Sequence, residues 1–165
     1  SPEAGSGHNL IRSMMEHIES QVQDGVKCID TTVIQGSLVQ VSEAEESFLK
    51  AINERVPEIF KKLSALKMDS GEASIRMMDL EASLRGVAQL RTEAQQANAD
   101  SATMFFTGLH SLLTVAVRRR VFLAAARVDS VKERLHVMGG AIRQWVEHGR
   151  TQRAAIDQLL PANHR

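Results

Sequence analysis

The chain has little of what β-proteins and disulfide-stabilised proteins are built from. Its 165 residues include no tyrosine, three prolines, one cysteine and only 4% aromatic residues. Since strands are enriched in aromatic and β-branched side chains, this composition argues against a β-sandwich or barrel and predicts an all-α fold. The single cysteine, Cys28, excludes an internal disulfide and a CxxC metal knuckle, and we interpret it as a small buried apolar residue.

Long hydrophobic runs are also missing. No segment reaches the roughly 18 apolar residues that a transmembrane helix needs, because Arg118, Arg119 and Arg120 interrupt the best candidate. The small, turn-rich residues 1–7 are interpreted as a flexible linker, and residues 8–165 as a single helical domain.

What the sequence does contain is helical periodicity. Apolar residues recur at mostly helical spacings from Ile11 to Ile52, with weak points at Gly25 and Gly36 and a predicted kink at Pro57. The segment "KMDSGEAS" predicts a break, where Asp69 or Ser70 caps a new helix.

The second helical stretch is predicted to be long. From Leu80 to Met138 its apolar residues follow four- and three-residue steps, which is the spacing of a coiled-coil seam, and Gly139 with Gly140 suggests a turn. These patterns predict an elongated, antiparallel three-helix coiled-coil bundle. Such a narrow unit exposes much of its seam, so we expect a dimer that covers it. The seam residues are Phe106, His110, Leu113, Val117, Val121, Val128 and Leu135.

Charge is unevenly distributed although the net charge is zero. Residues 1–100 carry 16 acidic and 10 basic side chains, whereas residues 101–165 carry 4 acidic and 10 basic ones. Three consecutive arginines fan over roughly 200° of a helix, so all three can remain solvated. Two interpretations stay open: an ordinary hydrated helix face, or a surface that binds the phosphates of an anionic membrane. The candidate lipid-contacting residues are Arg118, Arg119, Arg120, Arg127, Lys132 and Arg134.

Signatures of catalysis are weak. Glu133 and His136 form one ExxH pair, whereas a di-iron bundle needs two such pairs and two further glutamates. His110 lies on the apolar seam and is interpreted as a packing residue. We therefore expect no enzymatic activity, no metal and no cofactor. Few aromatics accompany the basic residues, so nucleic acid is not an expected partner.

Three segments together carry a resemblance to a known family. "IESQVQDGVKCIDTTVIQGSLVQVSEAEESFLKAI" is followed by "VAQLRTEAQQANADSATMFFTGLHSLLTVAVRRRVFLAAARVDSVKERL", and the chain closes with "AIDQLLPANHR". This succession resembles the helices of the BAR domain in sorting nexins.

The resemblance implies a function that is physical and not chemical. It implies a homodimer, or a heterodimer with a related chain, that senses or shapes curved anionic membranes of the endosome and acts with other trafficking proteins. The expected location is cytoplasmic and peripheral to the membrane. The alternative is a soluble coiled-coil scaffold that does not bind lipid, and a ferritin-like metalloenzyme is a more distant third.

Overall fold

The computed structural model describes residues 5–25, 31–67 and 73–160, with side chains described for 12–25, 31–67 and 79–160. Within these ranges the chain is all-helical, which confirms the predicted all-α class, but the described residues form five α-helices and not the three that were expected. The elements are α1 (Gly5–Gln23), α2 (Thr32–Lys62), the short 3-10 helix η2 (Leu63–Leu66), α3 (Ala73–Gln96), α4 (Asp100–Arg119) and α5 (Ala125–Gln158).

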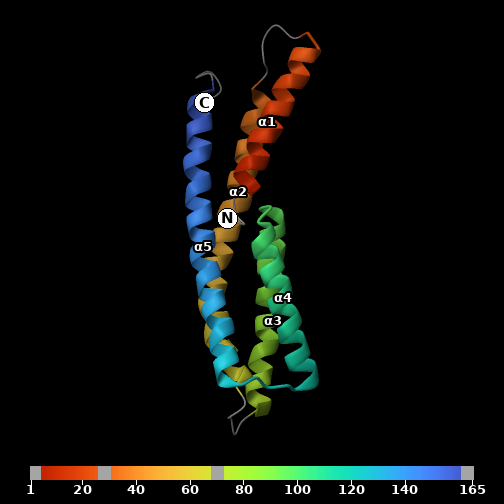
Figure 1. Ribbon diagram of the computed structural model, residues 1–165, viewed down its shortest axis with the longest axis vertical. Coiled ribbons are helices and arrows are strands. Elements are labelled where there is room, and N and C mark those ends of the chain that lie inside the picture. Colours follow the sequence, from red (N-terminus) through yellow and green to blue (C-terminus); the bar gives the residue numbers. More distant parts are fainter. Residues whose placement is uncertain (1–4, 26–30, 68–72, 161–165) are drawn as a thin grey trace.

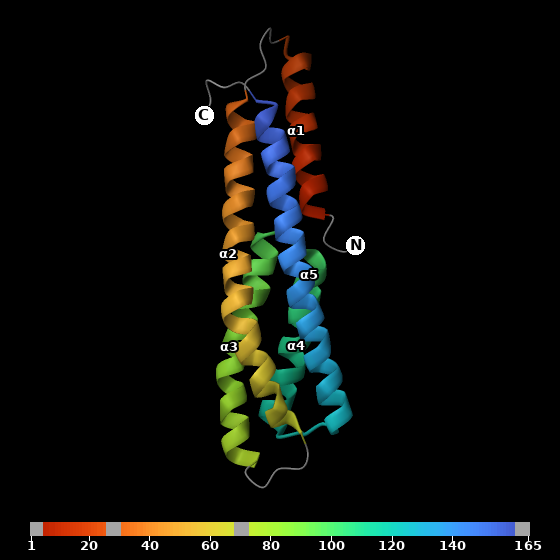
Figure 2. The same ribbon diagram turned by 90° about the vertical axis from the view of Figure 1, so that its left-hand side faces the viewer.

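Two long helices run the length of the molecule and the others cover parts of them. In Figure 1, α2 descends and α5 ascends, while α3 and α4 form a helical hairpin beside their lower half. Figure 2 shows α1 lying along the upper part of α5, away from the hairpin. The lower half therefore holds α3 and α4 beside α2 and α5, and the upper half holds α1 beside the rest of α2 and α5 (Figures 1 and 2).

The main core lies in the lower half, where α2, η2, α3, α4 and α5 all contribute side chains. Its largest fully buried members include Phe48, Ile52, Leu63, Leu80, Leu90, Phe106, Leu113, Leu135 and Ile142. A second, smaller cluster lies between the ends of α2 and α5. It consists of Ile34, Leu38 and Ile156, with Met14 and Ile18 of α1 packed against it. Most of the buried apolar surface is thus supplied by the four-helix part.

The second helical stretch is broken twice, so the expected single long helix is wrong. Asn98 adopts a left-handed conformation with φ 58°, and α3 turns back into α4. Arg120 has φ 52° and ends α4, with Val121 N–H donating to Ala116 O at 3.1 Å. Asparagine tolerates this conformation well and arginine less well, and neither position carries the glycine that usually marks such a helix end.

Glycines and proline fall differently from expectation. The weak point at Gly25 is a helix end, since α1 stops at Gln23 and Gly25 has φ 77°. Gly139 and Gly140 lie inside α5, so the suggested turn there is wrong. α2 continues through Pro57, where the sequence predicts a kink.

Several predictions fall on residues outside the described ranges. These are the interpretation of Cys28, the helix cap at Asp69 or Ser70, and the first four residues of the linker. α1 begins at Gly5.

Candidate functional site

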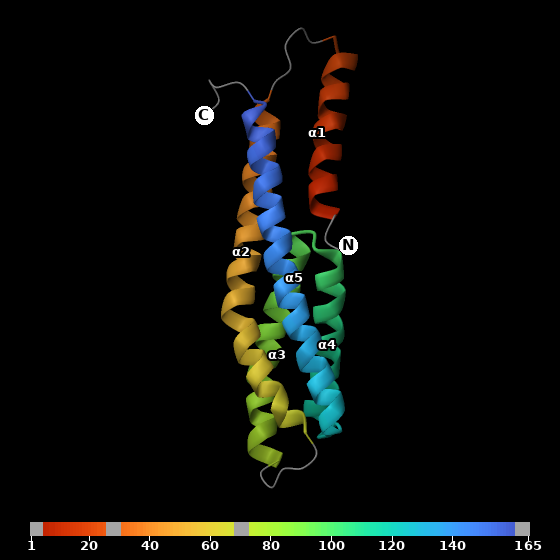
Figure 3. The same cartoon turned by 60° about the vertical axis from the view of Figure 1, so that its left-hand side comes forward.

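A short connection brings the end of α4 and the start of α5 to the same end of the molecule. The connection spans residues 120–124 and is fastened to η2, since Leu123 N–H donates to Leu66 O at 2.7 Å. Leu123 and Lys67 form an isolated parallel bridge. Figure 3 shows the two helix ends and this link at the lower end of the molecule.

This geometry gathers the six predicted cations. Arg118 and Arg119 occupy the last turn of α4, and Arg120 is the residue that ends it. Arg127 lies in the first turn of α5, and the other two follow within the next turns. At a rise of 1.5 Å per residue, all three of the α5 cations lie within about 14 Å of its first residue. We call the set of Arg118, Arg119, Arg120, Arg127, Lys132 and Arg134 the cationic end.

The five arginines of the cationic end are exposed to solvent. Among the described residues, none of the five makes an ion pair. Lys132 differs, because its Nζ donates to Ser64 Oγ at 3.0 Å and lies 4.6 Å from the centre of the Phe60 ring. Lys132 therefore helps to pack α5 against α2 and η2, and the arginines are the groups available to a ligand.

Two carboxylates of this part of the molecule form ion pairs with lysines outside the cationic end. Asp129 binds Lys67 at 3.2 Å, and Glu58 binds Lys62 at the same distance. Glu133 is exposed. Among the described residues, the five arginines therefore face solvent with no carboxylate bound to them.

A small apolar edge accompanies this charge. Val121 is 43% exposed, while Phe122 and Leu123 are half-buried against the main core. An exposed apolar residue between arginines can enter the interfacial region of a bilayer while the cations contact headgroups.

The predicted seam is buried by the chain itself. Phe106, Leu113, Val128 and Leu135 are fully buried in the main core. His110 and Val117 are half-buried, and Val121 is exposed. The premise that a second copy is needed to cover the seam is thus wrong, because most of the seam residues already lie in the chain's own main core, where α3 is the main neighbour of α4. The dimer itself stays a prediction.

The ExxH pair faces solvent. Glu133 and His136 are both exposed, and the His136 ring contacts the Phe60 ring edge-on with centroids 6.5 Å apart. Within the described residues, no group of three or more histidine, cysteine, aspartate or glutamate side chains could hold a metal ion.

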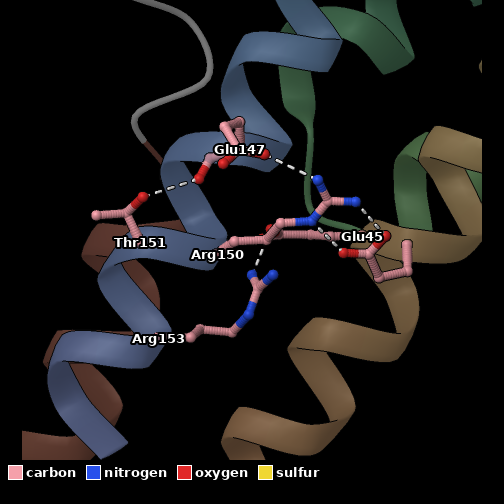
Figure 4. Close-up of polar contacts among 6 residues, drawn as sticks. Glu45, Glu147, Arg150, Thr151 and Arg153 are labelled. Carbon is pink, nitrogen blue, oxygen red and sulfur yellow. Dashed lines mark hydrogen bonds and ion pairs between the residues drawn. The ribbon is translucent and has the colours of Figure 1, made fainter. Parts of the chain in front are cut away.

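Sequence reasoning missed a second charged cluster, between α2 and the far part of α5. Arg153 NH1 donates to Glu45 Oε1 at 2.5 Å, and both side chains are buried. Beside them, Arg150 donates to both carboxylate oxygens of Glu46 at 2.6 and 2.7 Å and to Glu147 at 2.8 Å. Figure 4 shows the arginines reaching from α5 toward the glutamates. We call these five residues the paired segment.

Ion pairing in the paired segment shifts the pKa values of Glu46 and Arg150. The hydrogen bond from Arg150 is the largest influence on Glu46 and lowers its pKa from the usual 4.5, against a smaller effect of burial. The same hydrogen bonds raise the pKa of Arg150. Glu45 and Glu46 lie over a hundred residues from the arginines that bind them, so no local sequence pattern could have revealed these pairs. Only the pair of Glu147 with Arg150, three residues apart on α5, is local.

We found no match for the chain among models of known protein families, among curated proteins or among solved structures. None of the helices in the described ranges contains an apolar stretch that could cross a bilayer.

Proposed function

We propose that the protein is a non-enzymatic, membrane-associated helical adaptor that binds anionic membrane surfaces through its cationic end. The observation that carries this proposal is that five exposed arginines, none ion-paired among the described residues, lie on the adjoining ends of α4 and α5, with the exposed Val121 in the connection between them. A lysine or arginine near an anionic leaflet contributes about 1 kcal/mol, so five of them supply about 5 kcal/mol before screening by salt.

The contact that this arrangement favours is end-on. The cations lie at one end of a long molecule and not along its side, so the helices would stand away from the bilayer and leave their flanks for other partners. The resemblance to sorting nexins extends the proposal. Paired lengthwise with a second copy or a related chain, the helical molecule would present two such ends to a curved endosomal membrane during protein sorting.

Vesicle co-sedimentation tests the proposal. The protein should bind vesicles that contain phosphatidylserine and not vesicles of phosphatidylcholine alone, and binding should weaken as salt is raised. Replacing Arg118, Arg119 and Arg120 with glutamine removes about 3 kcal/mol of attraction, which corresponds to roughly a hundredfold weaker binding. Circular dichroism should show unchanged helix content in this variant.

A matched control removes three charges elsewhere. Lys50, Arg91 and Arg143 lie on the flanks of α2, α3 and α5, and their replacement by glutamine should leave vesicle binding nearly unchanged. Equal losses in the two triple variants would show that net charge and not the cationic end governs binding.

The second candidate function is a soluble helical scaffold. It is favoured by the burial of the seam, since the chain covers its own main core without a second copy. A folded protein that ignores anionic vesicles at physiological salt would support this alternative. Sedimentation velocity on the same sample tests the proposed dimer.

A further inference from the structure

We infer that the cleft between α2 and α3 binds a small phosphate-bearing anion. The cleft has a volume of about 360 Å³, which is within the usual range of small-ligand sites. Its polar lining consists of Arg55, Glu58 and Lys62 from α2, and of Ser83, Arg85 and Gln89 from α3. It lies on the flank of the four-helix part and shares no residue with the cationic end.

Arg55 contributes a partly buried guanidinium to the cleft from α2. Its Nε is buried and, among the described residues, has no hydrogen-bond partner. A ligand in the cleft cannot reach this shielded atom, whereas the two terminal nitrogens of the Arg55 guanidinium are not buried and can donate to one. The stem of Arg55 lies over Gly86, where an added Cβ would be 3.7 Å from Arg55 Cδ.

The charges of the cleft match a phosphate. Glu58 already binds Lys62 at 3.2 Å, so these two groups largely cancel. Arg55 and Arg85 remain, one on each wall, and together leave two positive charges. A phosphomonoester carries about −1.5 to −2 at neutral pH and offers several acceptor oxygens to guanidinium groups. A single carboxylate would leave one arginine uncompensated.

The remaining polar residues suit the rest of such a ligand. The Ser83 hydroxyl makes only a long 3.5 Å contact to Asp79 O, so it can turn toward an acceptor in the cleft. The exposed Gln89 amide can donate to a phosphate oxygen or accept from a hydroxyl group.

Titration of the full chain with inorganic pyrophosphate, against sodium chloride at equal ionic strength, tests the inference by calorimetry and thermal unfolding. We expect saturable binding and a rise in Tm. Arg55→Met and Arg85→Met should each weaken pyrophosphate binding at least tenfold. Arg91 lies on α3 like Arg85 but outside the cleft, so Arg91→Met should change this binding less than twofold. Gly86→Leu fills the cleft without changing charge and should also abolish binding.

The source of the phosphate is distinguished by a second arm. Vesicles that contain phosphatidic acid are tested with the Arg118, Arg119 and Arg120 glutamine variant, so that the cationic end contributes little. Pyrophosphate binding supports a soluble ligand, and vesicle binding that requires Arg55 without pyrophosphate binding supports a lipid headgroup. Absence of both, or an equal loss in Arg91→Met, would overturn the inference. Pyrophosphate binding that survives in the cationic-end variant separates this site from the proposed membrane contact.

Discussion

At its beginning α5 carries Arg127 and Arg134, which are exposed, and near its end it carries Arg150 and Arg153, which bind glutamates of α2. The residue type and the helix are the same, and the neighbours differ. α2 places Glu45 and Glu46 opposite the second pair, whereas no carboxylate in the described ranges binds the first pair, and Asp129 and Glu58 bind lysines. Pairing therefore separates arginines that hold helices together from arginines that are available to a ligand.

The two regions also differ in how much core they have. The cationic end caps a four-helix core with many fully buried side chains, so its arginines are not needed for packing. The paired segment lies near the end of α3, since Ser47 Oγ next to it donates to Glu93 Oε2 at 2.8 Å, and beyond it the apolar cluster of α2 and α5 is small. There, the buried pair of Arg153 and Glu45 joins the two long helices, and removing only one of two buried partners is far more costly than removing both.

The largest expected difference between the two regions comes from removing one arginine from each. Arg153→Met leaves the carboxylate of Glu45 buried without its guanidinium and should lower the free energy of unfolding by about 3 to 5 kcal/mol. Arg119→Met removes an exposed, unpaired arginine and should change it by less than about 0.5 kcal/mol. Urea unfolding followed by circular dichroism measures both.

A double variant sharpens this prediction. Replacing Glu45 and Arg153 together with methionine removes both buried charges, so most of the lost stability should return. If Arg153→Met lowers the free energy of unfolding no more than Arg119→Met does, the buried pair of Arg153 and Glu45 does not stabilise the fold. The proposed difference between the two regions would then be wrong.

An intermediate change in stability is expected when either of two glycines of α5 is replaced by alanine. A Cβ at position 149 would lie 2.3 Å from Glu45 Oε1, so Gly149→Ala must displace the ion pair and should cost about 1 to 3 kcal/mol. A Cβ at position 140 would meet nothing within 4 Å, so Gly140→Ala should gain about 0.5 to 1 kcal/mol from helix propensity. Thermal unfolding of the two variants should shift in opposite directions. Shifts of the same sign would show that the paired segment tolerates rearrangement.

The sequence predicted the helices and much of the core because both follow from the spacing of apolar residues. Leu80, Phe106, Leu113 and Leu135 were identified this way and are fully buried. The sequence did not predict the two helix ends in this stretch, because neither is marked by glycine or proline. The α3–α4 turn is built on Asn98 among alanines, and α4 ends on Arg120, so the apolar rhythm passes across both turns without interruption. The two adjacent glycines suggested a turn that is absent, since Gly139 packs within reach of Val56 inside a continuous helix.

The candidate sites also differ in how far the sequence could predict them. The cations at positions 118–120 and in early α5 are close in sequence, and the short connection brings them together. The cationic end could therefore be predicted from the sequence alone. The α2–α3 cleft and the paired segment join residues that are distant in sequence, such as Arg55 with Arg85 and Glu45 with Arg153. Only the fold brings these together, because their positions depend on how the helices align.

The smallest expected effect is the pH dependence of the exposed part of the paired segment. Arg150 lowers the pKa of Glu46 in the folded protein, so the resulting stabilisation is present above pH 4.5 and is lost as pH falls through the lowered pKa. Arg150→Gln should therefore be less stable than the wild type at neutral pH by a small amount, because the pair is solvent-screened. The difference should vanish in acid, when Glu46 is protonated in both proteins. Arg143→Gln is the control, since Arg143 Nε donates to the neutral Asn53 Oδ1 at 3.0 Å. Urea unfolding at a series of pH values should give a pH-dependent difference from the wild type for Arg150→Gln and a constant one for Arg143→Gln. A pH-independent difference in both variants would mean that Arg150 contributes through packing of its stem and not through the charge of Glu46.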